Sequence, residues 1–286
     1  MEGIDKDQLH RFIEAALEED IRDGDHTSLA CIPATQRSKA RLLVKDIGVI
    51  AGVEFAELVF KKVDPEAEFE QLIKDGSYVK DDDEAFYITC NSQALLKAER
   101  LILNTMQRMS GIATHSSRFF TEIEGTDVKI LDTRKTTPLM RFLEKWAVRI
   151  GGCHNYRDGL YDRIMIKDNH VDACGSITAA IEKTNAYLKD KSLDLEITVE
   201  VRNLVELHEV LKIGQVNRIM LDNFELPILA EAVATVDGKF ETEASGGVTL
   251  RTVRKIAKTG VDFISVGALT HSAGSLDLSL KVIENM

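Results

Sequence analysis

The sequence between residues 131 and 170, LDTRKTTPLMRFLEKWAVRIGGCHNYRDGLYDRIMIKDNH, decides which fold we expect. A short apolar run leads into it at 128–131 and another lies at 164–166, and charged residues follow each run at once. Short apolar runs bounded by polar residues are typical of buried parallel strands. Side chains just past the carboxyl ends of such strands converge at the mouth of an α/β barrel. The stretch therefore predicts a ligand site, lined with cations, at a barrel mouth.

The chain after residue 128 repeats this arrangement, because apolar runs alternate with patterns of helical period. Such alternation is typical of a parallel sheet, closed or open. The predicted strands are 128–131, 163–166, 196–201, 218–221, 240–244 and 263–266. The predicted helices include 177–188, 204–211, 227–236 and 250–258. Polar residues collect at the carboxyl ends of these strands, and a single barrel mouth would gather them.

The earlier part of the chain mixes helices and strands in an order that suggests a small α+β domain. An amphipathic helix opens it, and we predict strands at 39–44, 68–73 and 85–90 with a helix at 53–63. We place this α+β domain at 1–111 and the α/β barrel domain at 112–272. The closing segment 273–286 is a candidate to pack back on the first domain.

A long helix is predicted to begin at Ser92 and to run to about residue 109, because Gly111 is a typical stop signal. Arg100, Asn104 and Gln107 form a polar stripe along its flank. Spacing alone favours solvent exposure for this stripe.

Composition excludes several classes of function. The chain has 286 residues and a formal net charge of −11, which argues against nucleic acid as a partner. Its four cysteines show neither a CxxC pair nor the spacing of zinc ligands, so we expect a reduced, cytoplasmic protein. No apolar run approaches the roughly 20 residues that a membrane span needs. We therefore expect no membrane partner.

Four basic residues are the main candidates for ligand binding: Arg134, Lys135, Arg157 and Lys167. Two like charges roughly 4 Å apart repel by about 4 kcal/mol at an effective dielectric constant near 20, so converging cations need anions. In one interpretation, these cations are neutralised by local acids, namely Asp132, Asp158, Asp162 and Asp168. In the other, a polyanionic small molecule does so, and the arginines hold its carboxylates or phosphates in bidentate fashion.

Two glycine turns follow the last two predicted strands, Ser245-Gly246-Gly247 and Gly267-Ala268. Backbone N–H groups at such turns bind phosphate, and late loops of α/β barrels commonly do so. Glu200 and Asp222 end two earlier strands and suit sugar hydroxyls or a hydrated Mg²⁺, although salt bridges to the lysines would also explain them. No histidines flank them at ligand spacing, which argues against a zinc or iron site. His170 and His271 are candidates to line the site, and the role of His154 stays open.

Several of these segments together resemble quinolinate phosphoribosyltransferase, the carboxylating nicotinate-nucleotide pyrophosphorylase, over nearly the whole chain. The most specific motifs are DTRKTTP at 132–138, IKDNH at 166–170, LDNF at 221–224 and EASGG at 243–247. The resemblance implies that quinolinate and phosphoribosyl pyrophosphate give nicotinate mononucleotide, pyrophosphate and CO₂ with Mg²⁺, in NAD biosynthesis. It also implies an incomplete, TIM-like α/β barrel with a smaller N-terminal α+β open-sandwich domain. The assembly it implies is a homodimer with shared active sites, or a higher oligomer.

The resemblance also implies roles for individual residues. Quinolinate would be held by Arg134, Arg157 and Lys167, with Arg100 reaching across the dimer, which reverses the interpretation of its helix stripe. Lys135, Glu200 and Asp222 would be the catalytic residues, and the two acids would hold Mg²⁺, through water. Phosphoribosyl pyrophosphate would bind Lys135, Thr136, Glu200, Asp222, Ser245, Gly246, Gly247, Gly267 and Ala268.

Tyr156 departs from the pattern of the family, which usually has His-Arg where this chain has Tyr156-Arg157. We expect this change to alter substrate affinity or its pH dependence. Three alternatives stay open: a phosphoribosyltransferase for nicotinate or another heterocyclic acid, a Schiff-base aldolase using Lys135 or Lys167, and a non-catalytic ligand-binding barrel. A crowded cationic pocket favours a dicarboxylate, and an aldolase lysine would need apolar surroundings.

Overall fold

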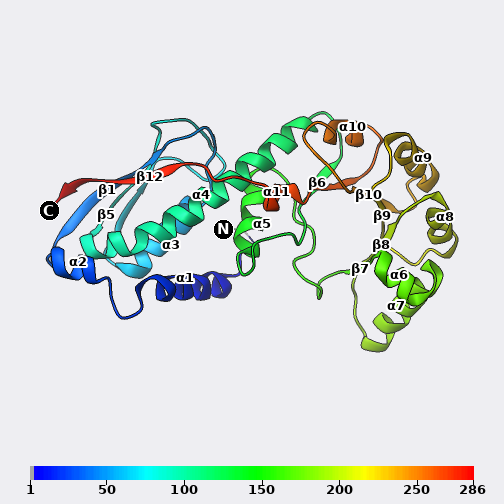
Figure 1. Ribbon diagram of the computed structural model, residues 1–286, viewed down its shortest axis with the longest axis horizontal. Helices are drawn as coiled ribbons and strands as arrows, with labels where there is room; N and C mark the ends of the chain where they lie inside the picture. The colour runs from blue at the N-terminus through cyan, green and yellow to red at the C-terminus, as the bar shows by residue number, and fades with distance from the viewer. Residues whose placement is uncertain (1–2) are drawn as a thin grey trace. The chain divides into compact units, whose positions relative to one another are not determined.

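The computed structural model describes residues 3–286, and the chain divides into two compact units (Figure 1). The first unit runs through Ser117 and also contains Phe142–Gly152 and Ala273–Met286. The second consists of Arg118–Arg141 and Cys153–Ser272. This division differs in detail from the boundary predicted at 111/112, because residues 112–117 and 142–152 belong to the first unit.

The first unit contains a four-stranded antiparallel sheet in the order β12-β1-β5-β3. Its strands are β1 (Arg37–Val44), β3 (Glu68–Gln71), β5 (Glu84–Asn91) and β12 (Leu278–Asn285). The last strand of the chain lies beside the first, with Ser38 opposite Asn285 and Val44 opposite Leu278; Figure 1 shows the red β12 along the blue β1. β2 (Gly48–Val49) and β4 (Tyr78–Val79) form a separate pair. The three predicted strands are confirmed, whereas β12 was not predicted.

The helices of this part are α1 (Lys6–Ile21), α2 (His26–Cys31), α3 (Val53–Val63), α4 (Ser92–Glu122) and α5 (Arg141–Ile150). Asp5 caps α1, since its side chain accepts hydrogen bonds from the backbone of Asp7 and Gln8. Phe60, Phe69 and Phe86 pack together under the sheet, and the rings of the last two lie 4.6 Å apart. A buried aromatic cluster thus joins α3 to strands β3 and β5.

The prediction that the long helix stops at Gly111 was wrong, because α4 continues to Glu122. The reason is packing. A Cβ atom at residue 111 would lie 1.9 Å from the carbonyl oxygen of Gly274, so only glycine allows residues 274–275 to approach the helix. Gly111 therefore allows two segments that are distant in sequence to pack closely.

The second unit contains a six-stranded sheet in the order β6-β11-β10-β9-β8-β7, and every neighbouring pair is parallel. Its strands are β6 (Lys129–Leu131), β7 (Ile164–Ile166), β8 (Ile197–Val201), β9 (Arg218–Asp222), β10 (Glu241–Ser245) and β11 (Phe263–Ser265). All six predicted strands are confirmed. Because β6 and β7 are the two edges of this sheet, the barrel is incomplete, and the α/β class is confirmed.

The helices of the second unit are α6 (Asp168–Cys174), α7 (Ile177–Lys191), α8 (Leu204–Ile213), α9 (Leu226–Val236), α10 (Val253–Ala257) and α11 (Ala268–His271). Figure 1 shows α6 to α9 on the outer side of the strands. The sequence did not predict α6 and α11, and α10 is shorter than predicted. Within residues 3–286, no helix is both long enough and apolar enough to cross a membrane.

We predict that Gly111→Ala lowers the free energy of unfolding by about 2 kcal/mol, because overpacking costs more than the helix propensity gained. Urea denaturation measures this. Gly274→Ala is the matched control, since a Cβ atom there meets nothing within 4 Å. A Gly111→Ala variant as stable as the wild type would contradict the packing explanation.

A second prediction concerns the pH dependence of stability at Asp75. Its carboxylate accepts hydrogen bonds from the backbone N–H groups of Val53 (2.8 Å) and Glu54 (3.4 Å) at the start of α3. Burial raises the pKa of Asp75 from 3.8 to about 6. The folded state therefore holds this proton more tightly than the unfolded state does. Its contribution to stability is fully present below about pH 4 and is lost as the pH rises through about 6.

Asp75→Asn keeps an acceptor oxygen but does not titrate. The free energy of unfolding of the wild type, relative to this variant, should therefore fall between pH 4.5 and 7, by at most about 3 kcal/mol. Urea denaturation at several pH values measures the difference. A difference that stays constant with pH would show that Asp75 does not titrate in this range.

Candidate active site

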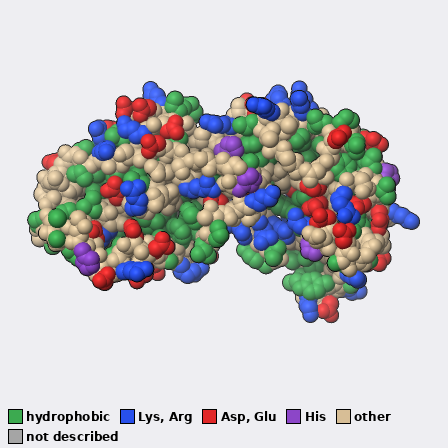
Figure 2. Space-filling view, in the orientation of Figure 1, with side chains coloured by type: hydrophobic (Ala, Val, Ile, Leu, Met, Phe, Trp, Pro, Cys, Tyr) green, Lys and Arg blue, Asp and Glu red, His purple; other side chains and the backbone are tan. Residues whose placement is uncertain are grey.

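A cavity of about 870 Å³ opens at the carboxyl ends of the strands of the second unit. Most of the predicted site residues line it: Arg134, Lys135, Arg157, Lys167, Glu200, Asp222, Ser245, Gly246, Gly247, Gly267 and Ala268. Figure 2 shows basic side chains gathered over the segment between β6 and β7. The parallel sheet thus brings residues at or near the carboxyl ends of six strands to one place, as barrel mouths do.

Three of the four predicted cations form no ion pair with an acid in the described part of the chain. Within residues 3–286, no carboxylate lies within ion-pairing distance of Arg134, Lys135 or Arg157. Burial, and then the nearby charge of Arg134, lower the pKa of Arg157. The cavity therefore contains three basic side chains that have no ion-pair partner within residues 3–286.

Two of the local acids that were candidates to pair with these cations bind other groups. The fully buried Asp132 accepts hydrogen bonds from the side chain of Asn155 (2.6 Å) and the backbone N–H of Tyr156 (2.8 Å). Asp162 accepts the N–H groups of Asp158 and Gly159. These contacts stabilise the loop between β6 and β7, and within residues 3–286 no ion pair joins these acids to Arg134, Lys135 or Arg157.

Lys167 is the one member of the four that forms an ion pair within the described chain. Its ammonium lies 3.3 Å from a carboxylate oxygen of Glu200, and its side chain is 46% exposed. Its backbone N–H donates to Nδ1 of His170 at the start of α6. A charged partner and solvent are the opposite of the apolar surroundings that a Schiff-base lysine needs, so the aldolase alternative loses support.

The glycine turn after β10 is held by the residues after β9. Ser245 donates its hydroxyl to Asp222 over 2.5 Å, and the amide of Asn223 donates to the same carboxylate over 2.7 Å. Gly246 has φ +94°, and a Cβ atom there would lie 2.1 Å from the side-chain oxygen of Asn223. Glycine is thus required here, and the turn leaves its backbone open to the cavity.

The second glycine turn closes against the loop after β6. A Cβ atom at Gly267 would lie 3.0 Å from the side chain of Lys135. Thr270 donates its hydroxyl to the backbone carbonyl of Lys135 over 2.8 Å. The lysine is therefore held beside this turn, where phosphate oxygens would lie.

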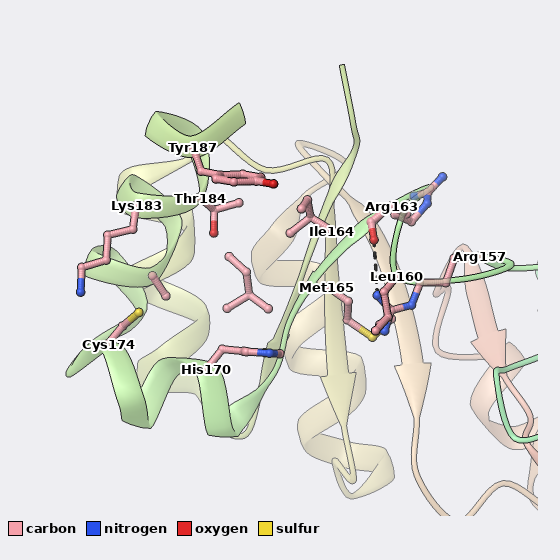
Figure 3. Close-up of a pocket in the computed structure, with 12 residues that line it drawn as sticks. Arg157, Leu160, Arg163, Ile164, Met165, His170, Cys174, Lys183, Thr184 and Tyr187 are labelled. Atoms are coloured by element: carbon pink, nitrogen blue, oxygen red, sulfur yellow. Dashed lines mark hydrogen bonds between the residues drawn. The ribbon is translucent and has the colours of Figure 1, made fainter. Parts of the chain in front are cut away.

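Arg157 stands on the wall between the cavity and a second hollow of about 380 Å³. Figure 3 shows this hollow between β7 and the helices α6 and α7, with the guanidinium of Arg157 donating to the carbonyl of Arg163 at 3.3 Å. Its lining is mostly apolar, and it includes His170 from α6. His170 therefore faces this hollow and not the larger cavity, whereas His271 lines the larger cavity.

Two predicted site residues lie elsewhere. Thr136 does not line the cavity, and its hydroxyl accepts a hydrogen bond from Arg141 over 2.9 Å. Arg100 lies exposed on α4 in the first unit. Its neighbour in the stripe, Gln107, is half-buried and donates to the carbonyl of Leu278, so solvent exposure was the wrong interpretation for that residue.

Sequence reasoning did not assign several residues that line the cavity: Thr133, Met165, Met220, Asn223, Val248, Thr249 and Ser265. Met165 and Met220 precede Lys167 and Asp222 by two positions, so the period of two along a strand predicts that they face the same way. Asn223 has φ +56°, a conformation that asparagine tolerates better than most residues. These signals were present in the sequence.

An open α/β barrel whose mouth combines uncompensated cations with two glycine turns defines an enzyme site for a phosphorylated, polyanionic substrate. Comparison with known proteins agrees. Residues 25–110 and 112–281 match the N-terminal and C-terminal domains of quinolinate phosphoribosyl transferase. The chain belongs to the quinolinate phosphoribosyltransferase family.

Individual relatives agree with this assignment. The chain is 45% identical to the chloroplastic nicotinate-nucleotide pyrophosphorylase [carboxylating] of Arabidopsis thaliana, over 96% of this chain and 82% of that protein. It is 39% identical to a probable nicotinate-nucleotide pyrophosphorylase [carboxylating] of Synechocystis, over 96% and 92% of the two chains. The crystal structure of NadC from Streptococcus pyogenes superposes with a TM-score of 0.92 at 35% identity, covering 99% of this chain and all of the other.

Proposed function

We propose that the protein transfers the phosphoribosyl group of phosphoribosyl pyrophosphate to the ring nitrogen of quinolinate. The acceptor then loses the carboxylate next to that nitrogen, and the products are nicotinate mononucleotide, pyrophosphate and CO₂. Membership of the family supports this reaction. The observation that carries it is one cavity in which three basic side chains without an ion-pair partner in residues 3–286 lie with two glycine turns.

The charge of the cavity favours a dicarboxylate acceptor. Arg134 and Arg157 can each hold one carboxylate in bidentate fashion, and Lys167 adds a third positive group. Nicotinate, with one carboxylate, would leave a cation without a partner in a confined space, which is costly. The geometry therefore supports quinolinate over nicotinate.

The other substrate would occupy the opposite side of the cavity. The backbone of Ser245–Gly247 and of Gly267–Ala268 would receive the 5′-phosphate, while Lys135 would lie against the pyrophosphate as it leaves. Asp222 and Glu200 would accept hydrogen bonds from the ribose hydroxyls. Thr136 would contribute by holding Arg141 rather than by touching the substrate.

Glu200 and Asp222 also fit a bound Mg²⁺. No group of three or more His, Cys, Asp or Glu side chains capable of holding a metal occurs within residues 3–286, but Mg²⁺ commonly takes one or two carboxylates together with water and substrate phosphates. When bound, Mg²⁺ would neutralise charge on the pyrophosphate group. Glu200 and Asp222 would hold it, while the protein's own lysines stabilise the leaving group.

Decarboxylation needs no protein nucleophile. Once the ring nitrogen carries the ribosyl group, its positive charge stabilises the electron pair that the departing CO₂ leaves on the adjacent carbon. The role of Arg134, Arg157 and Lys167 is then to orient the acceptor ring, since position and electrostatics carry most of the catalysis.

A direct assay tests the proposal. With carboxyl-labelled quinolinate, phosphoribosyl pyrophosphate and Mg²⁺, we expect labelled CO₂ in step with nicotinate mononucleotide, and no mononucleotide from nicotinate. Lys135→Ala and Arg157→Ala should each lower kcat/KM by at least about a hundredfold, because a transition-state contact or a charged anchor is lost. Turnover of nicotinate in place of quinolinate would overturn the assignment.

Lys212→Ala is a suitable control, because this exposed lysine of α8 lies outside the cavity. It should leave kcat/KM unchanged. Circular dichroism and urea denaturation should show that all three variants are folded. Full activity in the Lys135 or Arg157 variant would refute the assigned roles.

We also propose a homodimer in which Arg100 of one subunit completes the site of the other. Arg100 is exposed, and no carboxylate within residues 3–286 pairs with it, so it is free to bind an external anion. We also propose a cytoplasmic location, because four free cysteines suit a reducing compartment.

Complementation tests the shared site. Arg100→Ala and Lys167→Ala should each be inactive alone. After subunit exchange at equal amounts, about a quarter of the wild-type activity should return, because half of the dimers are mixed and each mixed dimer has one intact site of two. Exchange is verified with differently tagged subunits; verified exchange without recovery would contradict the shared site.

A further inference from the structure

Tyr156 lines the cavity, but no step of the proposed reaction uses it. Its hydroxyl lies 2.6 Å from the hydroxyl of the buried Thr198 on β8. Thr198 precedes Glu200 by two residues, and residues two apart share one face of a strand. Tyr156 is therefore tied to the barrel interior just below a proposed catalytic residue.

The backbone of Tyr156 is held as firmly as its side chain. Its N–H donates to the buried Asp132 over 2.8 Å, and the side chain of Asn155 donates to the other oxygen of the same carboxylate. Asp132 immediately precedes the loop that carries Arg134. One buried carboxylate thus joins the loop of Arg134 to the residue before Arg157.

The ring of Tyr156 covers a buried ion pair. The guanidinium groups of Arg163 and Arg218 each lie 5.3 Å from the ring centre, within cation–π distance. Arg218 pairs with the fully buried Glu243 at 2.9 Å, and neither of these two residues lines the cavity. The phenol ring therefore lies between this ion pair and the cavity.

We propose that the Tyr156–Thr198 hydrogen bond is a positioning contact for the acceptor substrate. It holds residues 155–157 against β8, and so fixes the guanidinium of Arg157 at the cavity wall, where it also donates to the carbonyl of Arg163. The inference rests on the proposed function, in which Arg157 holds a carboxylate of quinolinate. The glycine turns are held by other contacts, through Asp222 and Thr270, so the effect is confined to the acceptor.

A double-mutant cycle tests this contact through the Kd of quinolinate, measured by titration calorimetry on the full-length protein. Tyr156→Phe and Thr198→Val should each raise Kd about 3- to 10-fold, the effect of one lost neutral hydrogen bond. Tyr156→Phe combined with Thr198→Val should be no weaker than either alone, because both remove the same contact. Thr198→Ser, which keeps the hydroxyl, should bind like the wild type, and the KM of phosphoribosyl pyrophosphate should stay unchanged in all variants.

Two results would overturn the inference: an unchanged Kd in Tyr156→Phe, or effects that multiply in the double variant. If Thr198→Val does not fold, Tyr156→Phe and Thr198→Ser still decide between the outcomes. Turnover by the wild type is recorded separately. Binding of quinolinate without turnover would refute the proposed function while the Kd series still tests the contact, and a wild type that does not bind quinolinate would refute both.

Discussion

The close approach of three basic side chains in one cavity is the constraint on which the barrel unit depends. Arg134, Lys135 and Arg157 face one cavity, and no acid of the described chain pairs with any of them. Their mutual repulsion opposes folding, so other contacts must hold them in place. Asp132 does this without neutralising them, since it binds Asn155 and the backbone of Tyr156. A bound polyanion would relieve the repulsion, which links binding to stability.

Along each parallel strand, earlier residues lie deeper in the barrel and later residues lie nearer the cavity. On β9, Arg218 lies deep, Met220 lies above it, and Asp222 reaches the cavity. On β10, the buried Glu243 lies below Ser245, which donates to Asp222. The deep layer contains the ion pair of the buried residues Arg218 and Glu243, whereas the upper layer lines the cavity. Position along each strand therefore separates buried, paired charge from charge that lines the cavity.

Glycine shows how one residue type serves different physical needs. Gly111 lies within a continuous helix, where its missing side chain leaves room for the backbone of Gly274. Gly246 adopts a positive φ and leaves room for the side chain of Asn223. A local rule predicts a helix stop at the first and a turn at the second. The structure contains the turn at Gly246, whereas α4 continues through Gly111 because the partner of that glycine is not local.

The sequence by itself determined the α/β class, the six parallel strands and most of the cavity lining, since these follow from local apolar runs and from which residue ends each strand. It could not determine that the cations lack acid partners, because spacing does not show that Asp132 and Asp162 turn to backbone N–H groups. Nor could it show that β12 pairs with β1, or that Tyr156 reaches Thr198. These contacts join residues far apart in the chain, so only the tertiary structure decided them.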